Sequence, residues 1–239
     1  MIVLSTAVSH VQILSWEHLI PIVFAVFITV IFIRFSRTIS SEGQQRIIHY
    51  FAVFISVSVL AFHSYNVVTT DYNIRTDLPL YLCSLLGITI PMFTYYRKYW
   101  MFEILVFWII AGTAQGVMTP DIAEGFPSLD YFRYWIVHLG LLIVIFYNIV
   151  VFKLRPQFKS VFKSFFALQI YVVLMIVINY ILDANYFYLN IKPESASVLD
   201  YFGEWPYYII VAQLIVIPLF LIIYVPFYSS EVKKKLFSK

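Results

Sequence analysis

Seven apolar stretches, each about as long as a lipid bilayer requires, dominate this 239-residue chain. A helix needs about 20 mostly apolar residues to cross the hydrocarbon core. Hydrophobic residues make up 62% of the chain and charged residues only 12%, whereas about 25% of the residues in a soluble domain are charged. Lipid offers the backbone no hydrogen-bond partners, and the stretches do not alternate apolar and polar residues as barrel strands do. The sequence therefore predicts an all-α polytopic membrane protein, a single domain over residues 1–239 with helices near 17–35, 46–68, 78–96, 100–118, 131–152, 164–184 and 207–228.

The charged residues separate into two groups when the stretches are threaded alternately through a membrane. Thirteen of the sixteen Lys and Arg residues fall at one end of the bundle, and ten of the thirteen Asp and Glu residues fall at the other. Short loops rich in Lys and Arg face the cytoplasm. The N-terminus is therefore expected outside and the C-terminus inside, with only Arg75, Arg133 and Lys192 among the cations on the outer side.

Charge and cysteine content exclude several classes of partner and site. The net charge of +3 matches basic loops that meet anionic lipid headgroups, so no nucleic-acid partner is needed. The one cysteine, Cys83, excludes an intramolecular disulfide and a cysteine-built metal site. Residues 1–10 lack a basic region and no small-residue cleavage site follows, so the first helix is expected to remain as an anchor.

The two longest loops, near residues 119–130 and 183–200, both fall on the predicted outer side. They combine aromatic residues with carboxylates and prolines, and Tyr and Trp favour the headgroup layer. The loops are expected either to form a partial lid over the outer leaflet or to be plain connections.

Polar residues within the apolar stretches gather toward the predicted outer side. Such residues are costly in a membrane and are usually functional, so the set predicts a lined cavity that opens outward. The alternative is that each one ties neighbouring helices together by a hydrogen bond. Gln169 is instead expected near the cytoplasmic boundary. The outer set comprises His18, His63, Cys83, Gln115, His138, Asn179 and Gln213.

Cys83 and His138 carry the candidate chemistry. A lone membrane cysteine is often a small packing residue, and burial in an apolar layer disfavours the reactive thiolate. A neighbouring imidazole that accepts the thiol proton would activate it. Counted from the helix starts, Cys83 lies about 7 Å deep and His138 about 10 Å deep, whereas His18 and His63 lie closer to the surface, where they would orient a headgroup or phosphate.

Several short motifs occur in an order that resembles the transmembrane protein 164 family, which includes the bacterial YwaF-type integral membrane proteins. They are Glu17-His18-Leu19, the stretch Leu78-Pro79-Leu80-Tyr81-Leu82-Cys83-Ser84, Gly112-Thr-Ala-Gln115 followed by Thr119-Pro120-Asp121, the region of His138, Asn185-Tyr186, Lys192-Pro193-Glu194 and Trp205-Pro206. The similarity covers nearly the whole chain. Bacterial relatives commonly carry a histidine where this chain has Tyr81.

The family's eukaryotic members look like cysteine-dependent phospholipid acyltransferases. The resemblance implies a ping-pong reaction in which Cys83 takes a fatty acyl group from a phospholipid as a thioester and a lyso-lipid or another amphiphile collects it. His138 would serve as base and then as acid, and no cofactor is expected. Because a dry site strengthens donors aimed at an oxyanion, Ser84, Gln115 and Asn179 are candidate donors. The expected location is the plasma membrane of a bacterium.

Two other classes stay open. His18, His63 and His138 would suit a zinc-dependent lipid hydrolase, although no His pair with helical ligand spacing occurs. A transporter or lipid-binding protein would use Pro91 and Pro218 as helix breaks. The His-x-x-x-x-Asp pair of acyl-CoA-dependent glycerolipid acyltransferases is missing, and coenzyme A would arrive from the wrong side, so a lipid donor fits better.

Overall fold

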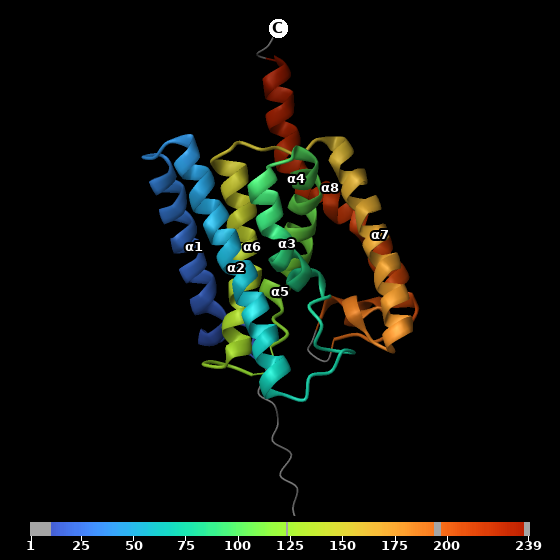
Figure 1. Ribbon diagram of the computed structural model, residues 1–239. Helices are drawn as coiled ribbons and strands as arrows, with labels where there is room; N and C mark the ends of the chain where they lie inside the picture. Colours follow the sequence, from blue (N-terminus) through green and yellow to red (C-terminus); the bar gives the residue numbers. More distant parts are fainter. Residues whose placement is uncertain (1–10, 123, 194–196, 237–239) are drawn as a thin grey trace, which may run out of the picture.

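The computed structural model describes residues 11–122, 124–193 and 197–236. The expectation about a leader segment concerns residues 1–10, which lie outside the described residues, as do Glu194 and Lys239. Throughout the described part the regular structure is helical (Figure 1). The α-helices are α1 (Trp16–Ser36), α2 (Ser41–Thr69), α3 (Leu82–Tyr96), α4 (Tyr99–Trp108), α5 (Ala114–Met118), α6 (Leu129–Val150), α7 (Phe158–Leu182) and α8 (Tyr207–Leu236).

Six of the described helical segments are long and apolar enough to cross a membrane, so the protein is a multi-pass membrane protein. One of them, Tyr99–Met118, is α4 and α5 joined by a π-helical turn, η1 (Ile109–Thr113). The prediction of seven spans is confirmed only in part, because α3 has 15 residues. At the helical rise it is about 22 Å long, less than the roughly 30 Å hydrocarbon core.

Helix α3 is shorter than predicted because it begins at Leu82 rather than near Leu78. Pro79 disfavours a helical conformation for the residue before it, and Tyr81 is extended, with φ −61° and ψ 141°. Cys83 is consequently the second residue of the helix and not the fifth or sixth. Its predicted depth along α3 is wrong, and Tyr81 lies before the helix rather than on another face of it.

Helix α6 is the centre of the bundle. It packs against α1, α2, α3, η1 and α5, and its buried residues lie all around it, whereas α1 buries little of its surface. A helix that is hydrophobic on all sides belongs in the interior of such a bundle. Helix α7 packs on α4 and contacts α8 at the other side of the molecule (Figure 1).

The two ends of the bundle differ in charge, as the sequence predicts. The turns α1–α2, α3–α4 and α6–α7 and the end of α8 lie together at the top of Figure 1, and we call this the basic end. The connecting residues 70–81, 119–122, 124–128, 183–193 and 197–206 lie at the opposite, acidic end.

Segments 70–81 and 183–193 form a cap over part of the acidic end. Tyr186 is fully buried, and its hydroxyl donates to the carbonyl oxygen of Ile74 at 2.6 Å and accepts from the N–H of Leu78 at 3.0 Å. The hydroxyl of Tyr188 donates to Oδ2 of Asp121 at 3.0 Å. These bonds join parts of the chain that are far apart in sequence, so the loops are more than plain connections.

Candidate functional site

The candidate site lies where the first turn of α3 and the middle of α6 meet the π-helical turn. A π-turn inserts one residue into a helix and frequently occurs at functional sites. Thr113, the last residue of η1, and Gly116 in α5 are three residues apart. Residues at this spacing lie on the same face of a helix, about 5–6 Å apart.

Cys83 lies against the Thr113 side of that face. Its sulfur is 3.9 Å from the Thr113 hydroxyl, and the side chain is partly buried. The Tyr134 and Tyr171 hydroxyls are within electrostatic range of this sulfur. The thiol therefore lies between α3 and η1, beside the Thr113 hydroxyl.

His138 lies against the Gly116 side of the same face. A Cβ placed on Gly116 would lie 2.7 Å from Cδ2 and 2.8 Å from Nε2 of His138, so only a glycine leaves room for the ring. Nδ1 lies 2.8 Å from the carbonyl oxygen of Tyr134, to which it donates. Nε2 then carries the lone pair, which is the form a general base requires.

The thiol and the imidazole share one helix face but do not touch. Among the described residues, no hydrogen bond joins Cys83 to a histidine nitrogen. The Arg133 guanidinium is within electrostatic range of both groups. It is paired with Asp130 on the preceding turn and stacks over Phe62 at 4.7 Å.

Two other predicted site residues keep free polar groups. Ser84 is buried, yet its hydroxyl makes no hydrogen bond within the described residues, and the same holds for the amide of the half-buried Gln115. Ser84 is next to Cys83, and Gln115 is between Thr113 and Gly116 in sequence. Both are available to a ligand at this site.

His18 and Asn179 have all of their polar groups in use. Nδ1 of His18 accepts from the N–H of Leu14 at 2.9 Å, and Nε2 donates to the carbonyl oxygen of Val117 at 2.7 Å. The Asn179 amide donates to the carbonyl oxygen of Tyr186 at 2.9 Å and accepts its N–H at 2.7 Å. These contacts favour the alternative in which such residues tie elements together.

Two further predicted residues, His63 in α2 and Gln213 in α8, differ in how their polar groups are used. The ring of His63 faces the main chain of Asp77 without a hydrogen bond of normal geometry, and Arg133 is within electrostatic range. Gln213 accepts a 2.8 Å hydrogen bond from Gln169. Because Gln169 is about midway along α7, its predicted place at the cytoplasmic boundary is wrong, and the outer layer does not include Gln213.

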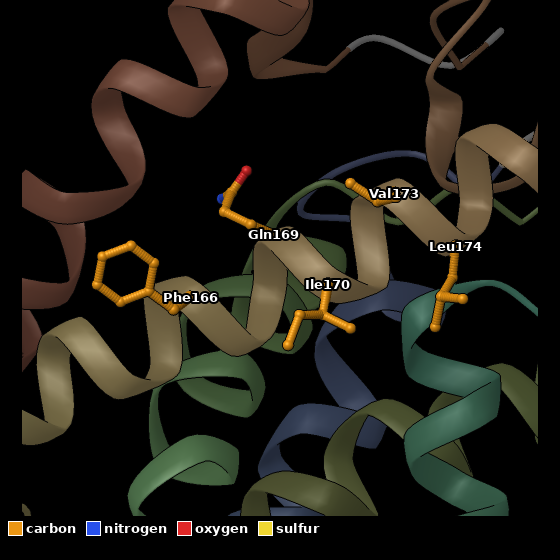
Figure 2. Close-up of a pocket in the computed structure, with 5 residues that line it drawn as sticks. All are labelled: Phe166, Gln169, Ile170, Val173 and Leu174. Atoms are coloured by element: carbon orange, nitrogen blue, oxygen red, sulfur yellow. The ribbon is translucent and has the colours of Figure 1, made fainter.

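A shallow apolar hollow of about 450 Å³ runs along α7 and is lined by Phe166, Gln169, Ile170, Val173 and Leu174 (Figure 2). Tyr171, whose hydroxyl donates to the carbonyl oxygen of Leu80 at 2.6 Å, lies on a different face of α7. The hollow is therefore on the outside of the bundle and does not open onto Cys83. The predicted outward cavity around Cys83 and His138 stays a prediction.

The histidines do not assemble the zinc site of the alternative hypothesis. Across residues 11–122, 124–193 and 197–236, no three His, Cys, Asp or Glu side chains lie close enough to hold a metal ion. Pro91 and Pro218 lie inside continuous helices, α3 and α8, so neither breaks its helix as the transporter hypothesis requires.

Sequence reasoning missed three residues of the site: Thr113, Gly116 and Tyr134. One signal was available, because the chain has only seven glycines and Gly112 and Gly116 lie on one apolar stretch. A glycine in such a helix usually marks a close approach.

The model of the TMEM164 family matches residues 13–224. The chain belongs to the TMEM164 family. The resemblance inferred from the short motifs is thereby confirmed. No curated protein sequence and no solved structure gives a significant match. The family match includes every residue of the candidate site, from His18 to Gln213.

Proposed function

We propose that this protein is a membrane acyltransferase that moves a fatty acyl chain between lipids through a thioester on Cys83, with His138 as general base and acid. The observation that carries this proposal is the shared helix face described above. Thr113 meets the thiol, and Gly116 one turn later makes room for the imidazole. Two helices, α3 and α6, thus bring a nucleophile and a base to one turn of a third segment.

The hydrogen bonds of His138 suit it to this task. Its Nδ1–H is held by the Tyr134 carbonyl, which fixes the tautomer and directs Nε2 toward Gly116. A base acts on a proton within hydrogen-bond reach or through one water, and catalytic contacts are often long until substrate binds. Proton transfer from Cys83 then proceeds through one bridging water or after substrate draws the two groups together.

The reaction has two balanced halves. The Cys83 thiol gives its proton to Nε2 of His138, and the thiolate attacks the ester carbonyl of a phospholipid. The tetrahedral intermediate collapses, the C–O bond breaks, and the lyso-lipid oxygen takes the proton back from His138. In the second half His138 accepts the proton of an acceptor hydroxyl, the acceptor oxygen attacks the thioester carbonyl, and the sulfur leaves and is reprotonated.

The site offers candidate donors for the oxyanion. The Thr113 hydroxyl is 3.9 Å from Sγ, and the hydroxyl of Ser84 and the amide of Gln115 are unengaged. Removing a single oxyanion donor typically costs about 10²–10³ in rate. The positive charge of Arg133 lies nearby and would hold the negative charge of a bound lipid phosphate.

The charge distribution supports an extracytoplasmic site. The acidic end carries the cap and the start of α3, where Cys83 lies, and the basic end carries most of the cations. By the positive-inside rule the basic end faces the cytoplasm. The acyl donor is then a phospholipid of the outer leaflet, the acceptor is a lyso-lipid or similar amphiphile, and the membrane is the plasma membrane.

Acyl exchange in proteoliposomes tests the proposal. The purified protein is reconstituted with an isotopically labelled phospholipid and an unlabelled lyso-lipid, and labelled chains on the acceptor are measured by mass spectrometry. We expect Cys83→Ala to abolish exchange and His138→Gln to lower it about 10²–10⁴-fold. Ser58→Ala is the control and should leave exchange unchanged, because Ser58 is half-buried in α2 and its hydroxyl donates only to the carbonyl oxygen of Phe54, one turn earlier. Undiminished exchange by a folded Cys83→Ala protein would overturn the proposal.

A further inference from the structure

The basic end of the bundle contains a second hollow, unrelated to the candidate acyl-transfer site. Its volume is about 320 Å³, which is at the lower end of the range typical of ligand pockets, roughly 300–1,000 Å³. It is formed where the end of α1, the start of α2 and the end of α6 meet. Two cations, Arg37 and Lys153, line it together with Ser36, Gln44 and three aliphatic side chains.

Hydrogen bonds among three helices form the floor of this hollow. Ser36 is fully buried, and its hydroxyl donates to the hydroxyl of Tyr147 at 2.6 Å. Tyr147 in turn donates to the carbonyl oxygen of Gln44 at 3.0 Å, and the Gln44 amide donates to the carbonyl oxygen of Ser36 at 2.7 Å. The floor therefore joins α1, α2 and α6 in a fixed arrangement.

The two cations at the rim have no counter-ion. Neither Arg37 nor Lys153 forms a salt bridge within the described residues, and no carboxylate lines the hollow. The aliphatic side chains line the apolar part of the hollow, and the two cations with Ser36 and Gln44 line its polar part. A ligand that matches it has a negative charge next to an apolar part.

The backbone at Lys153 has an uncommon conformation that a substitution can exploit. Its φ is 55°, in the left-handed region that is uncommon for residues other than glycine. Helices very commonly end on a glycine in this conformation just beyond the last turn. Lys153 has that conformation at the edge of the hollow, and a glycine at this position would relieve the strain.

We propose that this hollow binds a phosphate group, supplied by the headgroup of an anionic phospholipid whose apolar part lies against the aliphatic lining. Basic pockets between membrane helices on the cytoplasmic side bind anionic lipid headgroups. The same phosphate chemistry also admits a free phosphate, and the experiment below separates the two sources. The alternative is that Arg37 and Lys153 only complement the negative ends of α1 and α6; in that case they would affect stability and not binding.

Native mass spectrometry of the detergent-purified full chain tests this site. The protein is titrated with phosphatidylglycerol and, separately, with phosphatidylcholine. The wild type should retain phosphatidylglycerol preferentially, and Arg37→Gln/Lys153→Gln should weaken that retention about 30-fold, given the effect of two basic residues at a lipid surface. The control Arg46→Gln/Lys159→Gln removes the same charge from the same end without touching the hollow and should retain the preference.

A second variant separates binding from folding. Lys153→Gly removes one cation and suits the left-handed backbone, so its melting temperature should equal or exceed that of the wild type while retention of phosphatidylglycerol falls. Competition with millimolar inorganic phosphate identifies the source: undisturbed lipid retention supports a headgroup, and displacement supports a free phosphate at the same site. Equal losses in the target and control double variants, or unchanged retention in Lys153→Gly and the target variant, would overturn the proposal.

Discussion

The imidazole of His138 packs directly over Gly116, so that a Cβ on that glycine would lie 2.7 Å from the ring carbon Cδ2. Real Cβ atoms essentially never make so short a contact, and the neighbour here is the rigid ring of a buried side chain. The position of the candidate base therefore depends on the absence of a side chain on another helix.

Gly116→Ala is expected to displace His138 and to lower acyl exchange at least tenfold. Alanine favours a helix over glycine by about 1 kcal/mol, so loss of the helix would not be the cause. Gly112→Ala is the matched control, because its Cβ would meet Leu82 at an ordinary 3.4 Å. Both variants are compared by acyl exchange and by thermal melting in detergent. Equal activity in the two would show that the Gly116 contact does not position the base.

Residues with saturated hydrogen bonds should affect stability rather than activity. Asn179→Ala leaves a buried N–H and a buried carbonyl of Tyr186 unpaired, and each such group costs about 1–3 kcal/mol. Gln115→Ala breaks no hydrogen bond in the described structure and should melt within about 0.5 kcal/mol of the wild type, as substitutions away from such features do. Thermal melting checks both, and a larger loss for Gln115→Ala than for Asn179→Ala would contradict the assignment.

The hydrogen bond between Tyr188 and Asp121 should hold the cap. Tyr188→Phe removes a bond to a charged group, which is worth about 1.5–3 kcal/mol. We expect a lower melting temperature and faster proteolysis of segment 183–193. Tyr201→Phe is the control, because Tyr201 is 89% exposed. The idea fails if the two variants are cleaved at the same rate.

Alkaline pH should loosen the same contact. Burial, and next the Asp121 carboxylate, raise the pKa of Tyr188 above its usual value of 10. The folded state then holds this proton more tightly than the unfolded state, so stability is complete below pH 10 and falls as pH rises above it. One such group contributes a slope of up to about 1.4 kcal/mol per pH unit. Tyr188→Phe should show a shallower loss between pH 10 and 11 in thermal melts, and an unchanged slope would contradict this origin.

Much of the fold follows from hydropathy and charge. Six helical segments long enough to span a membrane coincide with predicted stretches, because a bilayer imposes a length and an apolar composition that are visible in sequence. The short α3 was not predictable from hydropathy, since Leu78 and Leu80 are as apolar as the helix that follows. Pro79 disfavours a helix through Leu78, and the extended backbone of Tyr81 places the start of α3 at Leu82.

The sequence identified the two reactive residues of the candidate site but not how they are arranged. Cys83 and His138 were selected by chemistry and depth, but the face they share depends on the π-turn at Ile109–Thr113, which no residue pattern announces. His18 and Gln213 were also predicted as site residues, but their polar groups bond to other parts of the chain. A polar side chain in a span has the same sequence signature whether it binds a ligand or, as these do, another part of the chain.

The most direct test uses the fact that Cys83 is the only cysteine in the chain. The protein is incubated with a phospholipid in the absence of acceptor, and its intact mass is measured before and after hydroxylamine, which cleaves thioesters. The account predicts one added acyl chain on the wild type, removed by hydroxylamine, absent from Cys83→Ala and strongly reduced in His138→Gln. An active protein that exchanges acyl chains without ever carrying one on Cys83 would contradict it.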